Sequence, residues 1–395
     1  MSSASVARPG HSNPGLPGEA RPSWSTSLSE YDIWNKRETN MKCISELCAI
    51  LLLIFLVHHI IQVHLRDIRD AVRVESFDTE KKDPIPDVEF PFKNIRDEEG
   101  NKLNIIAISA PFRETAHELK YESYKAAGMG FCGISSYLDF PNKITNPYED
   151  RFHEERDHDY TTMVSTWIHC FRDPGYKLQY SGLPLLLLTE ADLKNTDHYT
   201  LDTTIVKEYD FIYVCLDDNE QCTPGWNWHN RNWDLGKKCL EVMCEKHGLK
   251  GVIVGRKNCE FTEKCNGIVK TLPFLPFHEF QREMQKCRFL FVPNVSDASP
   301  RVITEAMCYN MPVLVNYNIL GGWHNVIPKV TGEFFTSEYD ISIAIDQLLG
   351  NFDQYTPRKW YTEHRGLTHS GEVLAQFLKE NYSNINRPEM KYAYI

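Results

Sequence analysis

Short apolar runs alternate with helical stretches from residue 103 onwards, and this alternation constrains the fold more than any other feature of the sequence. Runs such as "LNIIAIS", "FIYVCL", "GVIVG" and "FLFVPN" are apolar at consecutive positions, not at every second one. A strand that is apolar on both faces is typical of a parallel sheet with helices on both sides. The sequence therefore predicts an α/β protein.

The alternation occurs twice along the chain, which at 395 residues is long enough to bury two cores of ordinary size. The first series predicts a domain over residues 102–208, in which a helix is expected over 161–171. The second series starts at "YDFIYVCL" and predicts a domain over residues 209–350. A final helical segment, 351–395, is expected to pack back on the first domain.

The N-terminal hundred residues differ in composition from the rest. Residues 1–42 are rich in Ser, Pro and Gly, a composition that predicts a disordered tail. Leu47 to Val57 is unbroken apolar, so residues 43–65 are interpreted as one transmembrane anchor. The charged, Pro-containing stretch 66–101 is interpreted as a stem that follows the anchor.

A short tail, one membrane span and a large C-terminal part together predict a type II membrane protein of the Golgi or endoplasmic reticulum. Lys and Arg flank the span on both sides, so their distribution does not set the orientation. Sequons at Asn294 and Asn381 are compatible with a catalytic part in the lumen.

Cysteine usage is compatible with the same compartment. Ten of the twelve cysteines follow the span, and Cys222, Cys259 and Cys265 occur in polar loops where an oxidising lumen could pair them. Cys215, inside "FIYVCL", is expected to be a buried thiol. The sequence alone does not define the pairing.

The net charge of the chain argues against one class of partner. The formal charge is −11 and the isoelectric point is near 5.8. Binding to a phosphate backbone requires clustered Lys and Arg. Nucleic acid is therefore not an expected partner.

The stretch "SDASPRVITEAMCYNMPVLV" places two carboxylates around a predicted helix start. Ser299 is expected to cap the helix, with Pro300 at its first position. Asp297 would then lie in the loop after a buried strand and Glu305 on the helix, at the edge where α/β sheets bind ligands. A helix N-terminus suits a diphosphate, and carboxylates accept hydrogen bonds from sugar hydroxyls. This combination points to a nucleotide sugar.

The stretch "DASPRVITEAMCYNMPVLVNYNILGG" resembles the donor-binding segment of the retaining "group 1" glycosyltransferases of the GT-B fold. In that family an acid and a Glu, with seven residues between them, precede Ala-Met, Pro-Val and Gly-Gly. The resemblance covers about 209–350. It implies a GT-B fold, with two Rossmann-like domains facing across a cleft, here preceded by a single transmembrane helix.

The resemblance also implies roles for individual residues. Asp297, where the family usually has Glu, would contact the transferred sugar, and Glu305 would hold the ribose. Arg231 in "HNRNWDLGKKCLEV" would bind the donor phosphates, and the helix start that contains Ser299 would bind them too. The family's second phosphate-binding cation is missing at its usual place, and Arg256 or Arg301 would replace it.

The remaining candidate residues lie beside these. Thr271 and Leu272 in "KTLPFLP" would line the nucleotide pocket. In the first domain, Glu190 follows a strand at the position where the family often has a His. His169 in "TWIHCFR" is another candidate catalytic residue, with a structural role in the core as the alternative.

By resemblance, the expected activity is that of a hexosyltransferase that acts with retention of configuration and requires no metal. The donor would be a UDP- or GDP-linked sugar, and the acceptor a hydroxyl of a glycan, glycoprotein or glycolipid.

Two alternatives stay open at the level of sequence. The triplet Asp157-His158-Asp159 and the pair Asp217-Asp218 are typical of glycosyltransferases that bind Mn²⁺ through carboxylates. The Asp in place of Glu and the missing cation also fit an inactive, membrane-anchored sugar-binding relative.

Overall fold

The computed structural model describes residues 85–142 and 158–395. The predicted tail over 1–42, the predicted anchor over 43–65 and the start of the predicted stem lie outside the described residues. Within the described ranges, no helix is both long enough and apolar enough to cross a bilayer.

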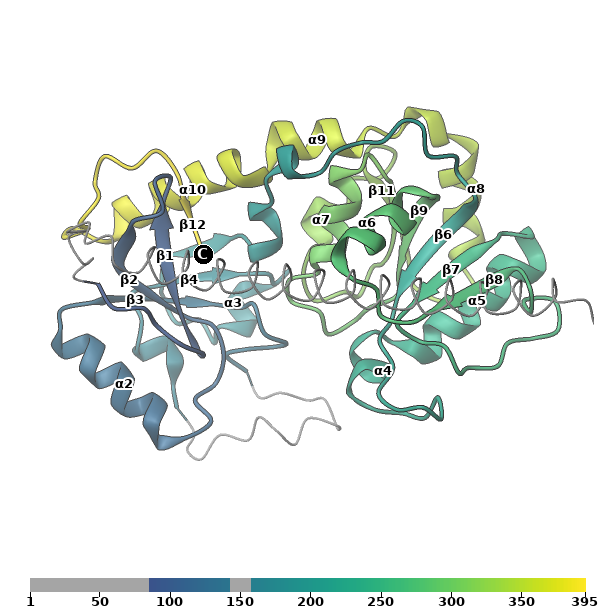
Figure 1. The fold of residues 1–395 in the computed structure, drawn as a ribbon. Helices are drawn as coiled ribbons and strands as arrows, with labels where there is room; N and C mark the ends of the chain where they lie inside the picture. The colour runs from purple at the N-terminus through teal and green to yellow at the C-terminus, as the bar shows by residue number, and fades with distance from the viewer. Residues whose placement is uncertain (1–84, 143–157) are drawn as a thin grey trace, which may run out of the picture. The chain divides into compact units, whose positions relative to one another are not determined.

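The second half of the chain forms a six-stranded sheet in which every neighbouring pair is parallel (Figure 1). Its strands are β6 (Tyr209–Val214), β7 (Gly251–Val254), β8 (Val269–Leu272), β9 (Cys287–Val292), β10 (Val313–Asn316) and β11 (Gly332–Phe335). They lie in the order β11-β10-β9-β6-β7-β8.

This order reverses direction between β6 and β9, as in a doubly wound dinucleotide-binding sheet. The loops after β6 and β9 run in opposite directions over the sheet and leave a crevice at its carboxyl edge. Ligands of such sheets bind at that place. The candidate residues Arg231 and Asp297 lie in the segments that follow these two strands.

Helices cover both faces of this sheet. The helices are α4 (Trp226–Asn230), α5 (Trp233–His247), α6 (Phe277–Gln285), α7 (Arg301–Cys308) and α8 (Ile341–Gly350). Phe211 and Tyr213 of β6 pack toward α5 and α8, whereas Ile212 packs toward α6 and α7. Successive side chains of a strand point to opposite faces, so continuously apolar strands fill both cores.

The first half forms a mixed sheet in the order β12-β1-β2-β3-β4-β5. Strands β2 (Lys102–Ile108), β3 (Gly130–Ile134), β4 (Thr166–His169) and β5 (Leu185–Leu187) are parallel. Strands β1 (Phe92–Asp97) and β12 (Ala393–Tyr394) are antiparallel to their neighbours. The prediction of an α/β fold with two sheets is confirmed, but this sheet lacks the doubly wound order.

Two segments of the first half differ from the sequence-based expectation. The end of the predicted stem, over 92–97, is β1, which pairs with β2 along the first sheet. The helix expected over 161–171 is instead a one-turn 3₁₀ helix, η1 (Tyr160–Thr162), followed by β4. All four residues of β4 are buried. A short run with Thr, Trp and Ile suits a central strand better than an amphipathic helix.

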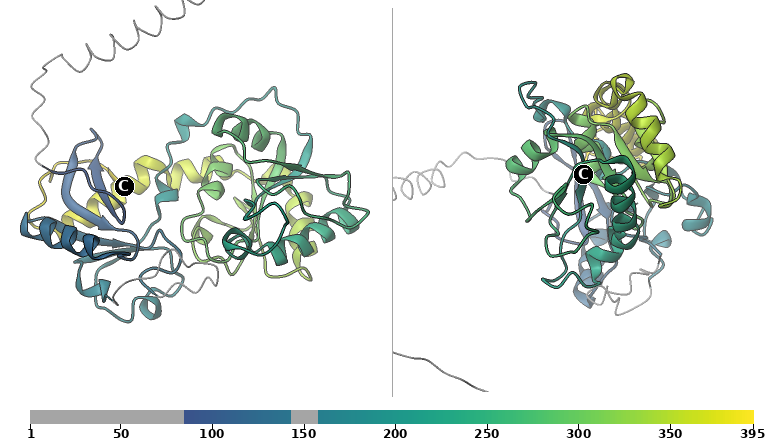
Figure 2. Two further views of the ribbon diagram at one scale, coloured as in Figure 1. Left: turned by 60° about the horizontal axis from the view of Figure 1, so that its bottom comes forward. Right: turned by 90° about the vertical axis from the view of Figure 1, so that its right-hand side faces the viewer.

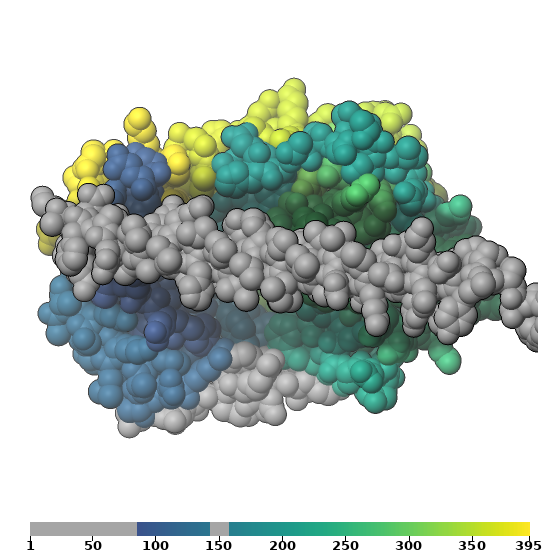
Figure 3. Space-filling view, in the orientation of Figure 1, coloured from purple at the N-terminus to yellow at the C-terminus, as the bar shows by residue number. Residues whose placement is uncertain are grey.

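The C-terminal segment returns from the second half to the first. Helix α9 (Pro357–His364) contacts α7, since Arg358 donates to the carbonyl of Cys308. Helix α10 (Gly366–Asn381) packs Leu374 and Leu378 against the first sheet, opposite α2 (Thr115–Ala126). Figures 1 and 2 show this path in yellow. In Figure 3, yellow C-terminal side chains adjoin blue side chains of the first half.

Candidate active site

A pocket of about 540 Å³ opens at the carboxyl edge of the second sheet, beside the reversal between β6 and β9. Its volume is in the range of pockets that bind small molecules. One side is polar, and the other is apolar. The polar lining residues are Arg231, Asp297, Ser299, Arg301 and Glu305.

Arg231 and Asp297 form an ion pair on the polar side. Arg231 ends α4, and its main-chain carbonyl accepts a hydrogen bond of 2.9 Å from the Tyr213 hydroxyl. Asp297 follows β9 and also accepts a hydrogen bond of 3.1 Å from the Asn294 amide. The sequence predicted Asp297 at this edge and, by resemblance, Arg231 on the donor phosphates, and the structure brings their charged groups into contact.

Glu305 lies on α7 and pairs with a cation that the sequence did not single out. Lys194 Nζ of the first half is 2.9 Å from Glu305 Oε1. Lys194 directly follows the 3₁₀ helix η2 (Glu190–Leu193), which lies between the first sheet and α7. Glu305, the carboxylate expected to bind a ribose, is therefore paired with a cation from the first half of the chain.

Glu190 pairs with two cations. Its carboxylate is 3.3 Å from Arg301 of α7 and also pairs with Lys93 of β1. Arg301 keeps 63% of its side chain exposed, whereas Glu190 keeps only 10%. Arg301 can thus leave Glu190 for a ligand in the pocket at little cost in buried contacts.

The three carboxylates together face four cations. The pairs are Asp297 with Arg231, Glu305 with Lys194, and Glu190 with both Arg301 and Lys93. This set has a formal charge of +1, so an anionic ligand can bind by taking over cations now shared with carboxylates. Arginine is well matched to such a ligand, since its planar fork binds two phosphate oxygens at once.

Three further predicted residues lie differently from the expectation. Helix α7 begins at Arg301, with Pro300 at the cap position and no side-chain cap, so the prediction of Ser299 as cap is wrong. Ser299 Oγ instead accepts a hydrogen bond of 3.1 Å from the Ala191 amide, although Ser299 does line the pocket. Thr271 and Leu272 lie in β8 and do not line it.

The prediction that Arg256 binds phosphate is not supported by its position. Arg256 is only 1% exposed and is held by Asp218, with 3.2 Å between Nη2 and Oδ2. It does not line the pocket. Of the two residues proposed for the second cation, Arg301 is therefore the one that a ligand can reach.

His169 is buried at the end of β4, stacked on Phe171, and does not line the pocket. Burial, helped by the nearby His324, lowers the pKa of His169 from its ordinary 6.5 to about 4. His324 contacts Asp192 at 2.9 Å, and both belong to the contact between η2 and the segment after β10. The structure thus supports the structural alternative for His169.

This buried His169 predicts an acid-sensitive fold. A histidine whose pKa is lower in the folded state than in the unfolded one costs stability as pH falls, here from about 6.5 down through 4. His169→Gln should remove roughly 2–3 kcal/mol of this loss. Urea unfolding of both proteins between pH 7.5 and 4 measures it. If the free energy of unfolding fell equally with pH in both proteins, the lowered pKa of His169 would be contradicted.

The apolar side of the pocket was also not expected from the sequence. Phe274 and Phe277 are 75% and 59% exposed, and Leu275 and Phe280 lie beside them. Large aromatic side chains left exposed at a pocket mouth suggest a partner with a flat apolar surface. The stretch "LPFLPFHEF" contains the signal, because Phe recurs there at every third position.

The residues of the metal-binding alternative do not form a site in the described part of the chain. No group of three His, Cys, Asp or Glu in this part could hold a metal ion. Asp157 lies outside the described residues, and Asp159 caps η1 by accepting from the Thr161 amide. Asp218 is engaged by Arg256 and by two main-chain amides.

No family model and no curated protein sequence matches the chain. Solved structures with a similar fold include HepE from Anabaena in complex with UDP-glucose, at 10% identity and a TM-score of 0.48. That comparison covers 67% of this chain and 76% of HepE.

Two further structures have similar values. Sucrose-phosphate synthase from Thermosynechococcus elongatus has 10% identity and a TM-score of 0.46, with 66% and 71% of the two chains covered. A glycosyltransferase from Rickettsia africae has 11% identity and a TM-score of 0.47, with 70% and 77% covered.

Proposed function

We propose that this protein is a glycosyltransferase that moves a sugar from a UDP- or GDP-linked donor to a hydroxyl of a glycan or glycoconjugate, with retention of configuration. The carrying observation is the pocket at the strand-order reversal of the second sheet. There, two arginines and two carboxylates line the same pocket as the exposed Phe274 and Phe277. Each part of a nucleotide sugar has a matching group in this pocket.

The diphosphate is assigned to the polar side, where Arg231 and Arg301 supply guanidinium groups next to the start of α7. The ribose is assigned to Glu305, since a carboxylate accepts hydrogen bonds from both ribose hydroxyls. The base is assigned to the apolar side, where Phe274 and Phe277 offer faces for stacking. Asp297, next to Arg231, is assigned to the transferred sugar.

In this proposal the protein acts mainly through charge. Arg231 and Arg301 stabilise the negative charge that develops on the leaving diphosphate, and Asp297 stabilises the positive charge that develops on the sugar. Glu190 comes from the first half and lies beside Arg301, and the proposal assigns it to the acceptor hydroxyl. No metal is part of this scheme.

Turnover measurements with the full-length protein in detergent test the proposal. A panel of UDP- and GDP-sugars would be screened for binding, hydrolysis and transfer, with and without EDTA. Turnover of one donor that is insensitive to EDTA is the expected result. Turnover lost in EDTA would favour the metal-dependent alternative, and binding without turnover would favour the inactive sugar-binding relative. A protein that binds no donor at all would contradict both proposed roles of the pocket.

We also propose that the protein is a type II membrane protein whose catalytic part lies in the Golgi or endoplasmic reticulum lumen. Two disulfides support an oxidising compartment, Cys222–Cys259 and Cys244–Cys265. The sequence had placed Cys222, Cys259 and Cys265 in loops that could pair. It did not indicate Cys244, which lies on α5 among core residues.

The two sequons are expected to differ in use if the lumenal location is correct. Asn294 is 2% exposed and contacts Asp297, so the folded protein has no room for a glycan there. Asn381 lies at the end of α10 and is partly exposed. Expression in eukaryotic cells should give one endoglycosidase-sensitive mass shift, removed by Asn381→Gln and not by Asn294→Gln. Persistence of the shift in Asn381→Gln would contradict the expectation, and its absence in the parent protein would count against the lumenal location.

A further inference from the structure

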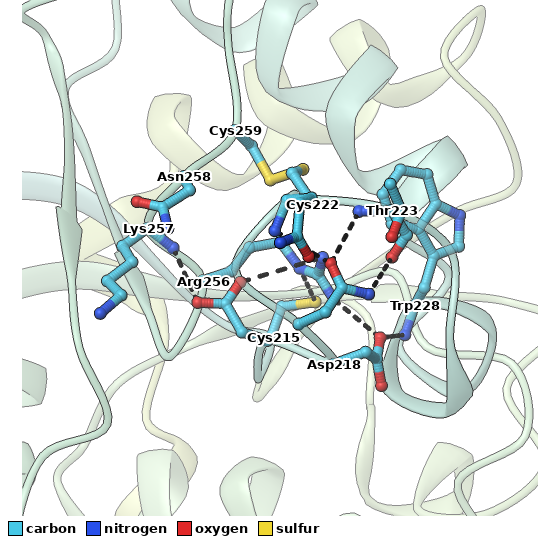
Figure 4. Close-up of a disulfide and its surroundings, with 12 residues drawn as sticks. Cys215, Asp218, Cys222, Thr223, Trp228, Arg256, Lys257, Asn258 and Cys259 are labelled. Atoms are coloured by element: carbon cyan, nitrogen blue, oxygen red, sulfur yellow. Dashed lines mark hydrogen bonds and ion pairs between the residues drawn. A yellow bond between two sulfur atoms is a disulfide. The ribbon is translucent and has the colours of Figure 1, made fainter.

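Arg256 follows β7 and is a buried charge with a nearly complete set of partners (Figure 4). Its Nε donates to Cys215 Sγ at 3.3 Å, and its Nη2 donates to the Leu216 carbonyl at 2.8 Å and to Asp218 Oδ2 at 3.2 Å. The guanidinium also lies over the rings of Trp228 and Trp233, 5.3 and 5.0 Å from their centroids. A buried arginine held this way fixes the groups around it, since leaving any of them unpaired is costly.

Asp218 connects Arg256 to the start of α4. Its two carboxylate oxygens accept hydrogen bonds from the main-chain amides of Asn227 and Trp228, at 2.6 and 2.8 Å. These amides belong to the first turn of α4, where the helix itself offers no acceptor. Gly225 allows the close approach, because a Cβ there would lie 2.4 Å from Asp218 Cβ. Asp218 therefore determines where this short helix begins.

Arg231 lies at the other end of the same helix. Its amide donates to the Asn227 carbonyl at 2.8 Å. Asn227 therefore connects the two residues, because its own amide donates to Asp218. A five-residue helix is not stable by itself and depends on such tertiary contacts. The position of the Arg231 side chain in the pocket is thus connected to Arg256 through one carboxylate and one helical turn.

The Cys222–Cys259 disulfide crosslinks the chain next to Asp218 and Arg256 (Figure 4). It joins the loop after Asp218 to the loop after Arg256, with 5.3 Å between the two Cα atoms. Asn258 adds a hydrogen bond of 2.9 Å to the Glu220 carbonyl across these loops. The disulfide restricts the separation of the two loops that contain the buried pair.

We infer that Asp218 and Arg256, closed by the Cys222–Cys259 disulfide, act as a positioning clamp that presents Arg231 to the donor diphosphate. Arg256 itself touches no ligand in this scheme. The identity of the ligand, a donor diphosphate, rests on the proposed function. The contacts by which Asp218 and Arg256 hold α4 do not depend on it. Arg256→Gln and Asp218→Asn are the variants that open it.

A double-mutant cycle on nucleotide binding separates positioning from a general loss of structure. UDP and GDP serve as probes for the full-length protein, with dissociation constants measured by a method that reads weak binding. Arg256→Gln and Asp218→Asn should each weaken binding about tenfold when Arg231 is present. In the Arg231→Ala background the same changes should weaken it by less than about twofold. Equal weakening in both backgrounds, or none in either, would overturn the inference.

Hydrogen exchange tests the clamp without reference to function. In Asp218→Asn, the peptide covering 226–232 should exchange faster than in the parent protein, while the peptide of α8 stays unchanged. Unchanged exchange at 226–232 would overturn the clamp. If the parent protein binds neither nucleotide, the proposed function fails and the exchange result still decides the clamp. Asp218→Asn carries the test if Arg256→Gln does not fold.

A matched control is available in the same sheet. Arg288 of β9 forms an ion pair of 3.2 Å with Asp210 and lies over the Phe352 ring. Like Arg256, it pairs with one carboxylate and lies over an aromatic ring, but its side chain is 33% exposed and it lies at the amino end of its strand, away from the pocket. Arg288→Gln should leave nucleotide binding and exchange at 226–232 unchanged. A tenfold loss of binding there would show that any lost ion pair has this effect, and would overturn the inference.

Discussion

Replacing Arg231 by alanine is expected to weaken donor binding roughly 10- to 100-fold, the effect of losing one charge-assisted contact to phosphate. Arg231 is the only one of the four site cations that comes from the segment after β6, so no neighbour on that side can replace it. The change also leaves Asp297 with the Asn294 amide alone, and adds an unpaired carboxylate beside the diphosphate. Both consequences weaken binding of an anion.

Titration calorimetry with UDP, GDP and the active donor measures this effect. Arg288→Ala is the matched control, because Arg288 and Asp210 pair across the same two strands at the opposite edge of the sheet. The control should bind donor like the parent protein, and circular dichroism should show both variants folded. An unchanged dissociation constant in folded Arg231→Ala would remove Arg231 from the donor site.

The second half of the chain was the easier half to predict, for a physical reason. Strands β7, β9 and β10 are buried over nearly all of their length, so each contains a continuous apolar run, and helices α6 and α7 lie between them. Residues that follow such strands must lie at the carboxyl edge, and this predicted the position of Asp297, whereas Arg231 was indicated by the resemblance of "HNRNWDLGKKCLEV". Glu305 followed from its position on the helix that was predicted to begin after that loop.

Residues whose role depends on the other half could not be predicted in this way. Lys194 and Lys93 reach the site because η2 and β1 lie against α7 and Glu190, and no periodicity in the sequence encodes that contact. Arg231 was assigned to the phosphates by resemblance, and Arg256 was one of two residues expected to replace the family's missing second cation. The structure separates them by burial, since Arg256 points into the core beneath α4 and Arg231 into the pocket.

The strand β4 shows a different limit. "TWIHCF" has apolar residues at spacings that fit a helix as well as a strand, and its four strand residues are too few to distinguish them. Pairing with β3 and β5 on both sides decides the outcome, because every backbone group of a buried segment needs a partner. His169 belongs to this strand, and its buried position follows from that decision.

Replacing Asp297 by asparagine is expected to separate catalysis from binding. Asn keeps the size of Asp and can still accept the hydrogen bond from Asn294, so the fold should be retained. Arg231 then loses its carboxylate partner and becomes fully available to the diphosphate. Donor binding should therefore stay the same or become a few-fold tighter, unlike in Arg231→Ala.

Transfer by the same variant should fall roughly 100-fold in kcat, because a neutral amide cannot stabilise the positive charge that develops on the transferred sugar. A lower kcat with an unchanged or lower KM is the mark of an interaction made only in the transition state. Steady-state kinetics on Asp297→Asn, with Asp210→Asn as the control at the opposite edge, measure both constants. Weaker binding with an intact kcat would instead mean that Asp297 serves only to hold Arg231, and that the sugar contacts another carboxylate. Glu190 would then be the nearest candidate, since it already lies beside Arg301 on the first-half side of the site.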